Sequence, residues 1–495
     1  MFPFGRIPIP DRRCFRTTSA VLAVALLAAC ASPRGLRTQA VPVEVNALHV
    51  SRSLAVVRLS PAAWPSGKWW RDYGDPQLDA LIGAALRDQP GLRVAEARVR
   101  AAGSLAAIAG AVGHPKVGAG AHSTRERFSD HGTVPPPVAG SWQTVNDVTV
   151  GAAWELDFWG RNRAAVDATL DREHAAEVDV QAARLMLTTA IARTYLRLDA
   201  AYAQRDLTGR TLVQREQILA LTRKRVAAGL DSQLELTQAE AALPATREQV
   251  AAIDESIALL DNQLAALAGH GPDDGKAIQR PQLAAIGPIN LPGNLPVELI
   301  GRRPDVIAER WRVEAAGRDI DVARAQFYPN VSLGAFVGLQ RLGFDDFLDT
   351  GSRIMGVGPA ISLPIFDGGR LRGNLGLHQA AYDAAVEAYN ATVIGAVHDV
   401  VDQLVSLDAV ARQRDEQAQA LSLSEHAYEL AQHRYRAGLA SYLQVLSAET
   451  QVLAQRQQTL VLQTRGRELR LALIRALGGG YVPDATATPG LAHRR

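Results

Sequence analysis

The sequence predicts a mainly α-helical fold with a small β part, in which one long unit is duplicated in tandem. Aromatic residues make up only 5% of the 495-residue chain, and a composition rich in Ala, Leu, Gln and Arg is typical of long helices. Residues 161–226 contain no proline, and two distant stretches of the chain match each other. We therefore expect a tandem-duplicated long-helix bundle or coiled coil that carries four short strands per chain.

The first thirty residues are typical of an export signal. Four arginines precede an apolar run at residues 20–29, which is too short to anchor the chain stably across a hydrocarbon core of roughly 30 Å. The run ends in Leu-Ala-Ala-Cys, which resembles the lipobox of bacterial lipoproteins, so we expect cleavage before Cys30 and lipidation of its thiol. Ala31 is not the aspartate that retains such proteins at the inner membrane, which favours the outer membrane. An ordinary signal peptide with a chance cysteine is the alternative.

Two copies of one unit follow. The residues from Arg225, RVAAGLDSQLELTQAE, match those from Arg434, RYRAGLASYLQVLSAE, at eight of sixteen positions without a gap. Upstream, VGHPKVGAGA from Val112 matches QFYPNVSLGA from Gln326 in its Pro, Val, Gly and Ala positions. The spacing of about 210 residues is far longer than a solenoid period of roughly 20 to 50 residues. The sequence therefore predicts duplication of a domain-sized unit.

Each unit has the predicted order helix, strand, strand, long helix, turn, helix. In the second unit the odd-numbered residues from Val331 to Leu339 are apolar, whereas their neighbours are small or polar apart from Phe336. This period of two indicates a strand with one apolar face. The other predicted strands are 117–127, 148–156 and 354–365. Stretches 135–137 and 343–351 are predicted to be the loops within the two strand pairs.

The long helices are predicted at residues 161–226 and about 375–436. A continuous helix over the first stretch would be roughly 100 Å long at about 1.5 Å per residue. After Gly229, apolar residues seven apart form a row at Leu236, Leu243, Val250, Ile257 and Leu264. A heptad pattern of this kind predicts coiled-coil packing. Pro244 interrupts the row, and we expect a bend or local break there.

Four strands per chain predict an oligomer, because about eight strands are needed even for a barrel filled by side chains. Strands exposed to lipid need every backbone group paired, so we expect several subunits to pool their strands into one barrel. The helices are too polar for lipid and would continue as a tube in water. Gly229 and Gly438 mark the hairpin tips of this tube, because glycine adopts the left-handed conformation that ends a helix without strain.

Charge and motif content argue against several classes of function. The chain has 53 Lys and Arg against 51 Asp and Glu, and the net charge of +2 gives no reason to propose a nucleic-acid partner. No zinc-protease, serine-hydrolase, phosphate-loop or calcium-loop motif occurs. His398 with Asp399 and Asp402 comes closest to a metal site, and a solvated helix face explains it better. We therefore expect no catalytic residue, cofactor or metal.

Two other groups of residues are interpreted as structural. Trp69 and Trp70 are predicted to pack locally, with a membrane-interface role as the alternative. Arg302, Arg303 and Asp305 are predicted to form salt bridges where Pro304 opens a helix, with an anion site as the alternative.

Four segments together resemble a known family. They are WWRDYGDPQLDALI from Trp69, GRRPDV from Gly301, FYPNVSL from Phe327 and SLPIFDGGRLRGN from Ser362. In these segments the chain resembles the TolC-like outer-membrane efflux proteins, in particular their lipidated NodT-like members. The resemblance covers almost the whole mature chain and implies a homotrimer, with a twelve-stranded β-barrel in outer-membrane lipid and a twelve-helix tunnel. It also implies a periplasmic adaptor (membrane fusion) protein and an inner-membrane RND-type pump as partners.

The same resemblance implies where the tunnel closes. In the family, residues just after the second hairpin tip close the periplasmic end, so Leu443 is expected to form a hydrophobic constriction. Gln444 and Ser447 occupy positions where relatives often carry acidic rings, and their lack of charge does not support gating by acidic repulsion. Tyr435 matches an aromatic that helps to hold the closed state, although Tyr435 and Leu443 could also be core positions. The expected adaptor-docking residues at the hairpin tips are Gly229, Leu230, Gly438 and Leu439.

We therefore expect the outer-membrane exit duct of a tripartite efflux pump, which passes drugs or other small molecules. The alternatives are a protein-secretion duct of the same architecture and a periplasmic coiled-coil lipoprotein without a pore. The chain is predicted to divide into a signal peptide (1–29), a lipidated linker (30–75), a first repeat (76–272), a second linker (273–294), a second repeat (295–480) and a flexible tail (481–495).

Overall fold

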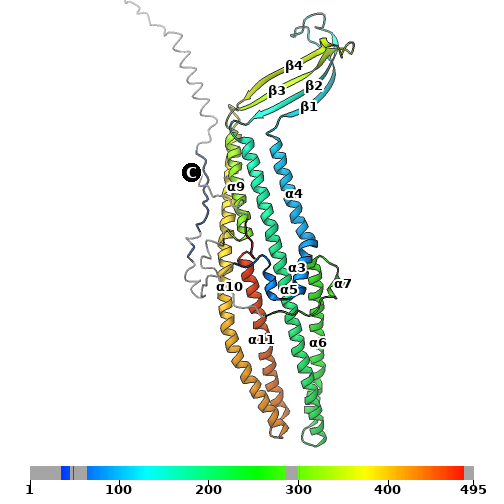
Figure 1. The fold of residues 1–495 in the computed structure, drawn as a ribbon, viewed down its shortest axis with the longest axis vertical. Helices are drawn as coiled ribbons and strands as arrows, with labels where there is room; N and C mark the ends of the chain where they lie inside the picture. Colours follow the sequence, from blue (N-terminus) through cyan, green and yellow to red (C-terminus); the bar gives the residue numbers. More distant parts are fainter. Residues whose placement is uncertain (1–34, 45–47, 50–63, 285–298, 300, 484–495) are drawn as a thin grey trace, which may run out of the picture.

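The computed structural model describes residues 35–44, 48–49, 64–284, 299 and 301–483. These residues form an elongated molecule with a small sheet at one end and two helical hairpin tips at the other (Figure 1). The predicted signal peptide, Cys30 and parts of the predicted linkers and tail lie outside the described residues.

Each half of the chain contains the same order of elements, as predicted. The first half has α4 (Pro90–Ala111), β1 (Lys116–Arg127), β2 (Trp142–Leu156), α5 (Arg161–Ala227) and α6 (Gln233–Ala268). The second half has α9 (Pro304–Ala325), β3 (Asn330–Leu342), β4 (Arg353–Ser362), α10 (Arg370–Arg436) and α11 (Tyr442–Ala476). Shorter elements are η2 (Trp69–Tyr73), α3 (Pro76–Asp88), α7 (Pro272–Gly275) and η3 (Thr350–Ser352). The predicted tandem duplication is therefore confirmed.

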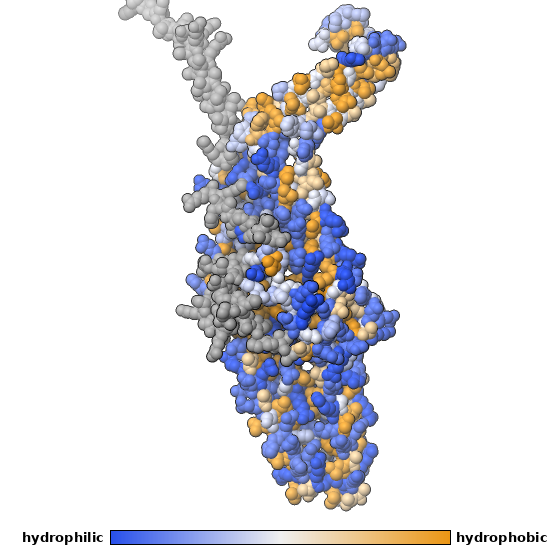
Figure 2. All heavy atoms as spheres, in the orientation of Figure 1, coloured by the Kyte–Doolittle hydropathy of each residue, from blue (hydrophilic) through white to orange (hydrophobic). Residues whose placement is uncertain are grey.

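The four strands form one antiparallel sheet in the order β1-β2-β3-β4. The register brings apolar residues together, because Val337 of β3 lies between Val150 of β2 and Met355 of β4. The alternate positions include Gly338, which lies beside Thr149. The alternation predicted for β3 is thus confirmed across the sheet. Hydrophobic residues gather over the sheet in Figure 2, whereas the helices have a mixed surface.

Two boundaries of the predicted strands 148–156 and 354–365 differ from the structure by more than one residue. Strand β2 begins at Trp142, six residues before the predicted start, because residues 142–147 pair with the end of β1. These added residues are mostly polar, so the hydrophobic pattern did not reveal them. Strand β4 ends at Ser362 and not at residue 365. Pro364 follows closely, and proline cannot donate to a strand ladder.

The two long helices are continuous, and each spans 67 residues, which corresponds to roughly 100 Å. Helix α10 begins at Arg370, earlier than predicted, because the Asp367 carboxylate accepts the backbone N–H groups of Gly369 at 3.0 Å and Leu371 at 2.8 Å. Of the bend or local break predicted at Pro244, the break does not occur, since α6 runs through this residue. Pro244 and Glu240 are both exposed, so water can serve the Glu240 carbonyl that proline leaves without a donor.

Packing between helices forms the core. The predicted heptad row faces inward, with Leu243, Ile257 and Leu264 buried, and α5 packs along α4, α6 and α9. Helix α10 packs along α9 and α11. Among the residues that the structure describes, no helix combines the length and the apolarity needed to cross a membrane.

The residues interpreted as structural behave as predicted, except that Arg302 lies over the Trp64 ring, 5.0 Å from its centre. Trp69 and Trp70 are buried in a cluster with α3 and α5, and the Trp70 indole donates to Asp79 at 2.8 Å. Arg303 forms salt bridges with Asp305 at 2.6 Å and with Asp399 at 3.0 Å. Within the described ranges, no group of three or more His, Cys, Asp or Glu side chains is placed to hold a metal ion.

Candidate functional site

The two hairpin tips use the same backbone turn. At the first tip the N–H of Leu230 bonds to the carbonyl of Arg225 at 2.9 Å, and at the second the N–H of Leu439 bonds to that of Arg434 at 2.8 Å. Gly229 has a φ of 74° and Gly438 a φ of 76°, as the left-handed residue of this helix-ending motif requires. The predicted tips are thus observed at these positions. Leu230 and Leu439 are 65% and 70% exposed, so each tip presents an apolar side chain.

A buried hydrogen-bond network ties the second hairpin to the first. The Tyr435 hydroxyl donates to Asp231 at 2.6 Å and lies 3.2 Å from the Thr222 hydroxyl. Arg225 holds the same Asp231 carboxylate through two bonds of 2.9 and 3.1 Å, and it donates to the Tyr435 carbonyl at 3.1 Å. The Arg225 guanidinium also lies 4.4 Å from the centre of the Tyr435 ring. We call Thr222, Arg225, Asp231 and Tyr435 the tip lock.

Burial and pairing shift the acid–base properties of the tip lock. Burial raises the pKa of Tyr435 to about 12, and the hydrogen bond to Asp231 adds to this. The pKa of Asp231 is lowered, chiefly by its hydrogen bond from Arg225. The side chains of Arg225 and Asp231 are only 11% and 7% exposed, so solvent screens this pair weakly. At neutral pH the lock therefore consists of an ionised pair and a neutral phenol.

The predicted gate residues separate into two environments. Tyr435 lies in an apolar cluster with Tyr442 and Val445, so the core interpretation holds for its ring. Leu443 is 63% exposed in the single subunit, so it is not part of the subunit's core. Gln444 and Ser447 are also exposed on α11. The three exposed residues follow one another within little more than a helical turn, as neighbours on one face do.

A second polar group joins the hairpins farther from the tips. The Glu449 carboxylate of α11 is 3% exposed and lies 3.4 Å from Arg215 of α5. Arg215 also donates to the Thr246 hydroxyl of α6 at 2.7 Å, so this side chain of α5 contacts both the other helix of its own hairpin and α11 of the second. Burial raises the pKa of Glu449. This ion pair was not predicted from the sequence.

The repeat contains the signal that was missed. Glu240 and Glu449 end the two matching segments, yet Glu240 is exposed and pairs with Arg223 at 3.0 Å. Glu449 instead stands among apolar residues spaced three and four apart, between Val445 and Val452. A carboxylate at such a seam position indicates a buried charge that needs a partner.

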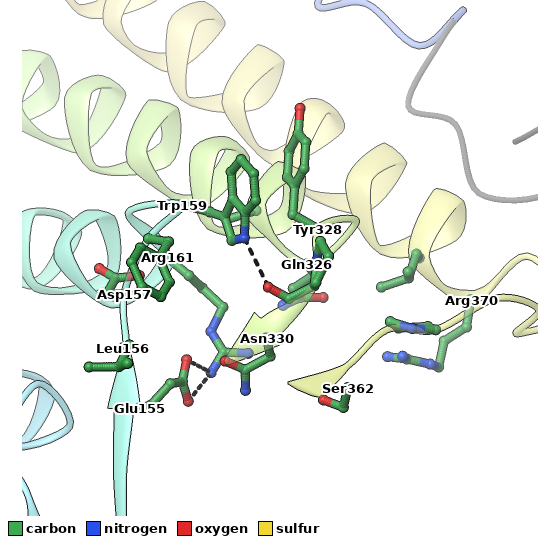
Figure 3. Close-up of a pocket in the computed structure, with 15 residues that line it drawn as sticks. Glu155, Leu156, Asp157, Trp159, Arg161, Gln326, Tyr328, Asn330, Ser362 and Arg370 are labelled. Atoms are coloured by element: carbon green, nitrogen blue, oxygen red, sulfur yellow. Dashed lines mark hydrogen bonds and ion pairs between the residues drawn. The ribbon is translucent and has the colours of Figure 1, made fainter. Parts of the chain in front are cut away.

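The junction of sheet and helices forms a pocket of about 350 Å³. Figure 3 shows Glu155, at the end of β2, and Arg161, at the start of α5, facing each other there. Their ion pair has a distance of 2.5 Å. Trp159 stacks on Tyr328 with ring centres 4.6 Å apart, and its indole donates to the Pro329 carbonyl at 2.9 Å. Half-exposed Trp and Tyr side chains are typical of the boundary between a lipid-facing sheet and water.

Comparisons with known proteins agree with this geometry. The sequence profile described as outer membrane efflux protein matches residues 81–270 and 295–479. The chain is 42% identical over 365 residues to the fusaric acid resistance protein FusA of Burkholderia cepacia. The aligned residues cover 73% of this chain and 69% of that protein. It is 34% identical over 433 residues to the multidrug resistance outer membrane protein MdtP of Shigella flexneri. The aligned residues cover 86% of this chain and 88% of that protein.

Solved structures show the same fold. The outer membrane protein VceC of Vibrio cholerae is 39% identical and superposes with a TM-score of 0.79, covering 84% of this chain and 100% of that one. The outer-membrane channel OprN is 26% identical and superposes with a TM-score of 0.80, covering 91% of this chain and 99% of that one.

Proposed function

The chain belongs to the outer membrane efflux protein family, and on that premise we propose that it is the lipid-anchored exit duct of an efflux pump with an RND-type inner-membrane transporter. Channels of this family are homotrimers that work with adaptor proteins and inner-membrane pumps. The observation that carries the proposal is a four-stranded sheet with one apolar face, joined to two helical hairpins that extend far from it. Three such sheets supply the strands of one closed barrel, and no edge then remains unpaired.

The proposed cargo is small organic molecules. FusA is named for resistance to fusaric acid and MdtP for multidrug resistance, and both names support a duct for toxic compounds. The chain has no visible nucleotide-binding motif, so the energy for export is assigned to the inner-membrane partner.

The proposed gate lies at the hairpin tips. Tyr435 holds the two hairpins of one subunit together through Asp231, and this contact supports a role in keeping the channel closed. Leu443, whose side chain is exposed, is proposed to narrow the pore together with its counterparts in the other two subunits. Gln444 and Ser447 are proposed to line the same opening without charge, so closure relies on packing and on the tip lock.

The proposed contact with the adaptor is the tip of each hairpin. Gly229 and Leu230 form one docking residue pair, and Gly438 and Leu439 form the other. The exposed leucines support this assignment, because apolar side chains at the end of a polar tube gain from being covered. At the opposite end, Cys30 is proposed to carry the acyl groups that attach the mature chain to outer-membrane lipid.

Planar-bilayer recordings of the purified full-length protein test the duct. We expect discrete conductance steps, and we expect the channel to stay open for longer when Leu443 is replaced by Ala. A protein that folds as a trimer but gives no conductance, with or without this substitution, would contradict the proposal. For the anchor, the mature mass of the Cys30→Ser variant should lack the acyl groups that the wild-type protein carries.

A further inference from the structure

The described N-terminal residues run along α10 without forming a helix or strand of their own. We call residues 35–44 the strap (Figure 1). Its backbone is bound by two side chains of α10, Asp383 and Asn390. The Asp383 carboxylate accepts the N–H groups of Gln39 and Ala40 at 2.9 and 3.0 Å. These bonds hold the strap through its backbone, and the side chains of Ala40 and Val43 also pack against the hydrophobic core along α10.

Asn390 pairs with the strap in a way that only a carboxamide can. Its side-chain oxygen accepts the N–H of Val43 at 2.7 Å, and its nitrogen donates to the carbonyl of Val41 at 3.1 Å. In an extended chain these two backbone groups point to the same side. Pro42 lies between them and favours the extended conformation at Val41. Asn390 is 9% exposed, and a buried carboxamide requires such partners.

The spacing of the two side chains matches the strap. Asp383 and Asn390 are seven residues apart, which is about 10.5 Å along a helix. Ala40 and Val43 are three residues apart, which is about 10 Å in an extended chain. Strap and helix therefore run in the same direction. Leu36, at the upstream end, packs against the cluster of Leu371, Leu375 and Phe327 just below the sheet.

We propose that Asp383 and Asn390 form a docking site that holds the strap and thereby places the N-terminal acyl anchor at the base of the barrel. The proposal rests on the lipidation of Cys30 proposed above. Cys30 is six residues upstream of Leu36, so it can reach at most about 20 Å from the base of the sheet. A free strap would let the anchor enter the membrane tens of ångströms farther away, because every released residue adds about 3.3 Å of reach.

Limited proteolysis of the purified full-length trimer tests the docking. Arg37 lies in the strap and its side chain is exposed, so trypsin cleavage after it measures release of the strap backbone. We expect the variant with Asp383→Ala and Asn390→Ala to be cleaved there at least about tenfold faster than wild type. Asn390→Asp keeps the acceptor for Val43 but loses the donor to Val41, and its rate should be intermediate. Asn374→Ala is the matched control, because Asn374 of α10 bonds to Gln326 and not to the strap.

The same digest separates the two proposals. The mass of the released N-terminal fragment reports the acyl groups, whereas the cleavage rate reports docking, so absence of acylation leaves the docking result readable. In cells, the double variant should remain acylated but show a several-fold lower yield of membrane-inserted trimer. Equal cleavage rates in wild type and double variant would overturn the docking site. Faster cleavage together with wild-type insertion would overturn its role in placing the anchor. If the double variant fails to form trimers, the cleavage rates of Asn390→Asp and Asn374→Ala are compared instead. Faster cleavage of Asn390→Asp supports the docking site, and equal rates overturn it.

Discussion

Replacing Asp231 with alanine should open the channel. The Asp231 carboxylate accepts three hydrogen bonds, two from Arg225 and one from the Tyr435 hydroxyl. Alanine removes all three and leaves the Arg225 guanidinium without its acidic partner in a site where its side chain is 11% exposed. Arg225 keeps its bond to the Tyr435 carbonyl and its contact with the Tyr435 ring.

The expected magnitude follows from this burial. Removing one partner of a buried ion pair costs about 3 to 5 kcal/mol, because the remaining charge stays desolvated. The tip lock retains some contact with water, so we take the lower figure of about 3 kcal/mol. Arg225 and Asp231 belong to the same hairpin, but opening moves the Tyr435 ring off the Arg225 guanidinium and lets water reach it. In the variant the desolvation cost therefore falls on the closed state. The ratio of open to closed channels then rises by about a hundredfold, since roughly 1.4 kcal/mol corresponds to a factor of ten.

Single-channel recording measures this ratio as the fraction of time spent open. Asp254→Ala is the matched control, because Asp254 of α6 also pairs with an arginine of α5, Arg205, at 2.5 Å, but both side chains are nearly half exposed. Loss of an exposed pair costs less than about 1 kcal/mol. Tyr435→Phe, which removes a single hydroxyl, should give a smaller increase than Asp231→Ala. If Asp231→Ala and Asp254→Ala have the same open fraction as wild type, the tip lock does not hold the channel closed.

Three further predictions follow from the same contacts. The pKa of Asp231 is lowered from its ordinary value of 3.8, so the tip lock is fully present above that pH and is lost as the pH falls below it. The open fraction of the wild-type channel should therefore rise below about pH 4. The open fraction of Asp231→Ala should not change over the same range. Glu449→Ala leaves Arg215 buried without its acidic partner and should lower the free energy of unfolding by about 3 kcal/mol. Glu425→Ala, which breaks an exposed pair with Arg456, should lower it by less than about 1 kcal/mol. Denaturant unfolding followed by circular dichroism compares the two variants, and equal losses would contradict the buried pair. Val357→Lys puts a charge on the apolar face of β4 and should destabilise the trimer in lipid vesicles by about 2 to 4 kcal/mol. Thr149→Lys, on the opposite face of the sheet, should be tolerated. A larger loss of trimer stability in Thr149→Lys than in Val357→Lys would mean that the sheet faces are assigned wrongly.

Local patterns in the sequence predicted most of the fold. Long stretches without proline, heptad rows and a period of two over residues 331–339 predicted the helices and the apolar face of the sheet. The errors arose where a tertiary contact overrides the local pattern. The polar start of β2 becomes strand because β1 pairs with it, and α6 continues through Pro244 because solvent reaches the turn that proline weakens.

The site was predicted less completely than the fold. Family resemblance pointed to Tyr435 and the hairpin tips, but the partners of Tyr435 lie more than 200 residues away in sequence. No spacing rule connects Asp231 or Arg225 to a tyrosine at that distance. Such pairs appear only when two hairpins are placed side by side. The strap contacts have the same property, since Val43 and Asn390 are 347 residues apart.

Divergence between the two repeats explains why the tip lock can join the hairpins in only one way. In the matching segments, Arg225 corresponds to Arg434, Asp231 to Ala440, and Val226 to Tyr435. The first copy therefore supplies the ion pair and lacks the phenol, while the second supplies the phenol and lacks the acid. Two first hairpins, or two second hairpins, cannot build the lock. In a ring where the two kinds of hairpin alternate, each seam joins unlike hairpins, and the tip lock fastens the seam in which Tyr435 meets Asp231. The network observed here lies within one subunit, so opening at this seam requires a subunit to separate its own two hairpins.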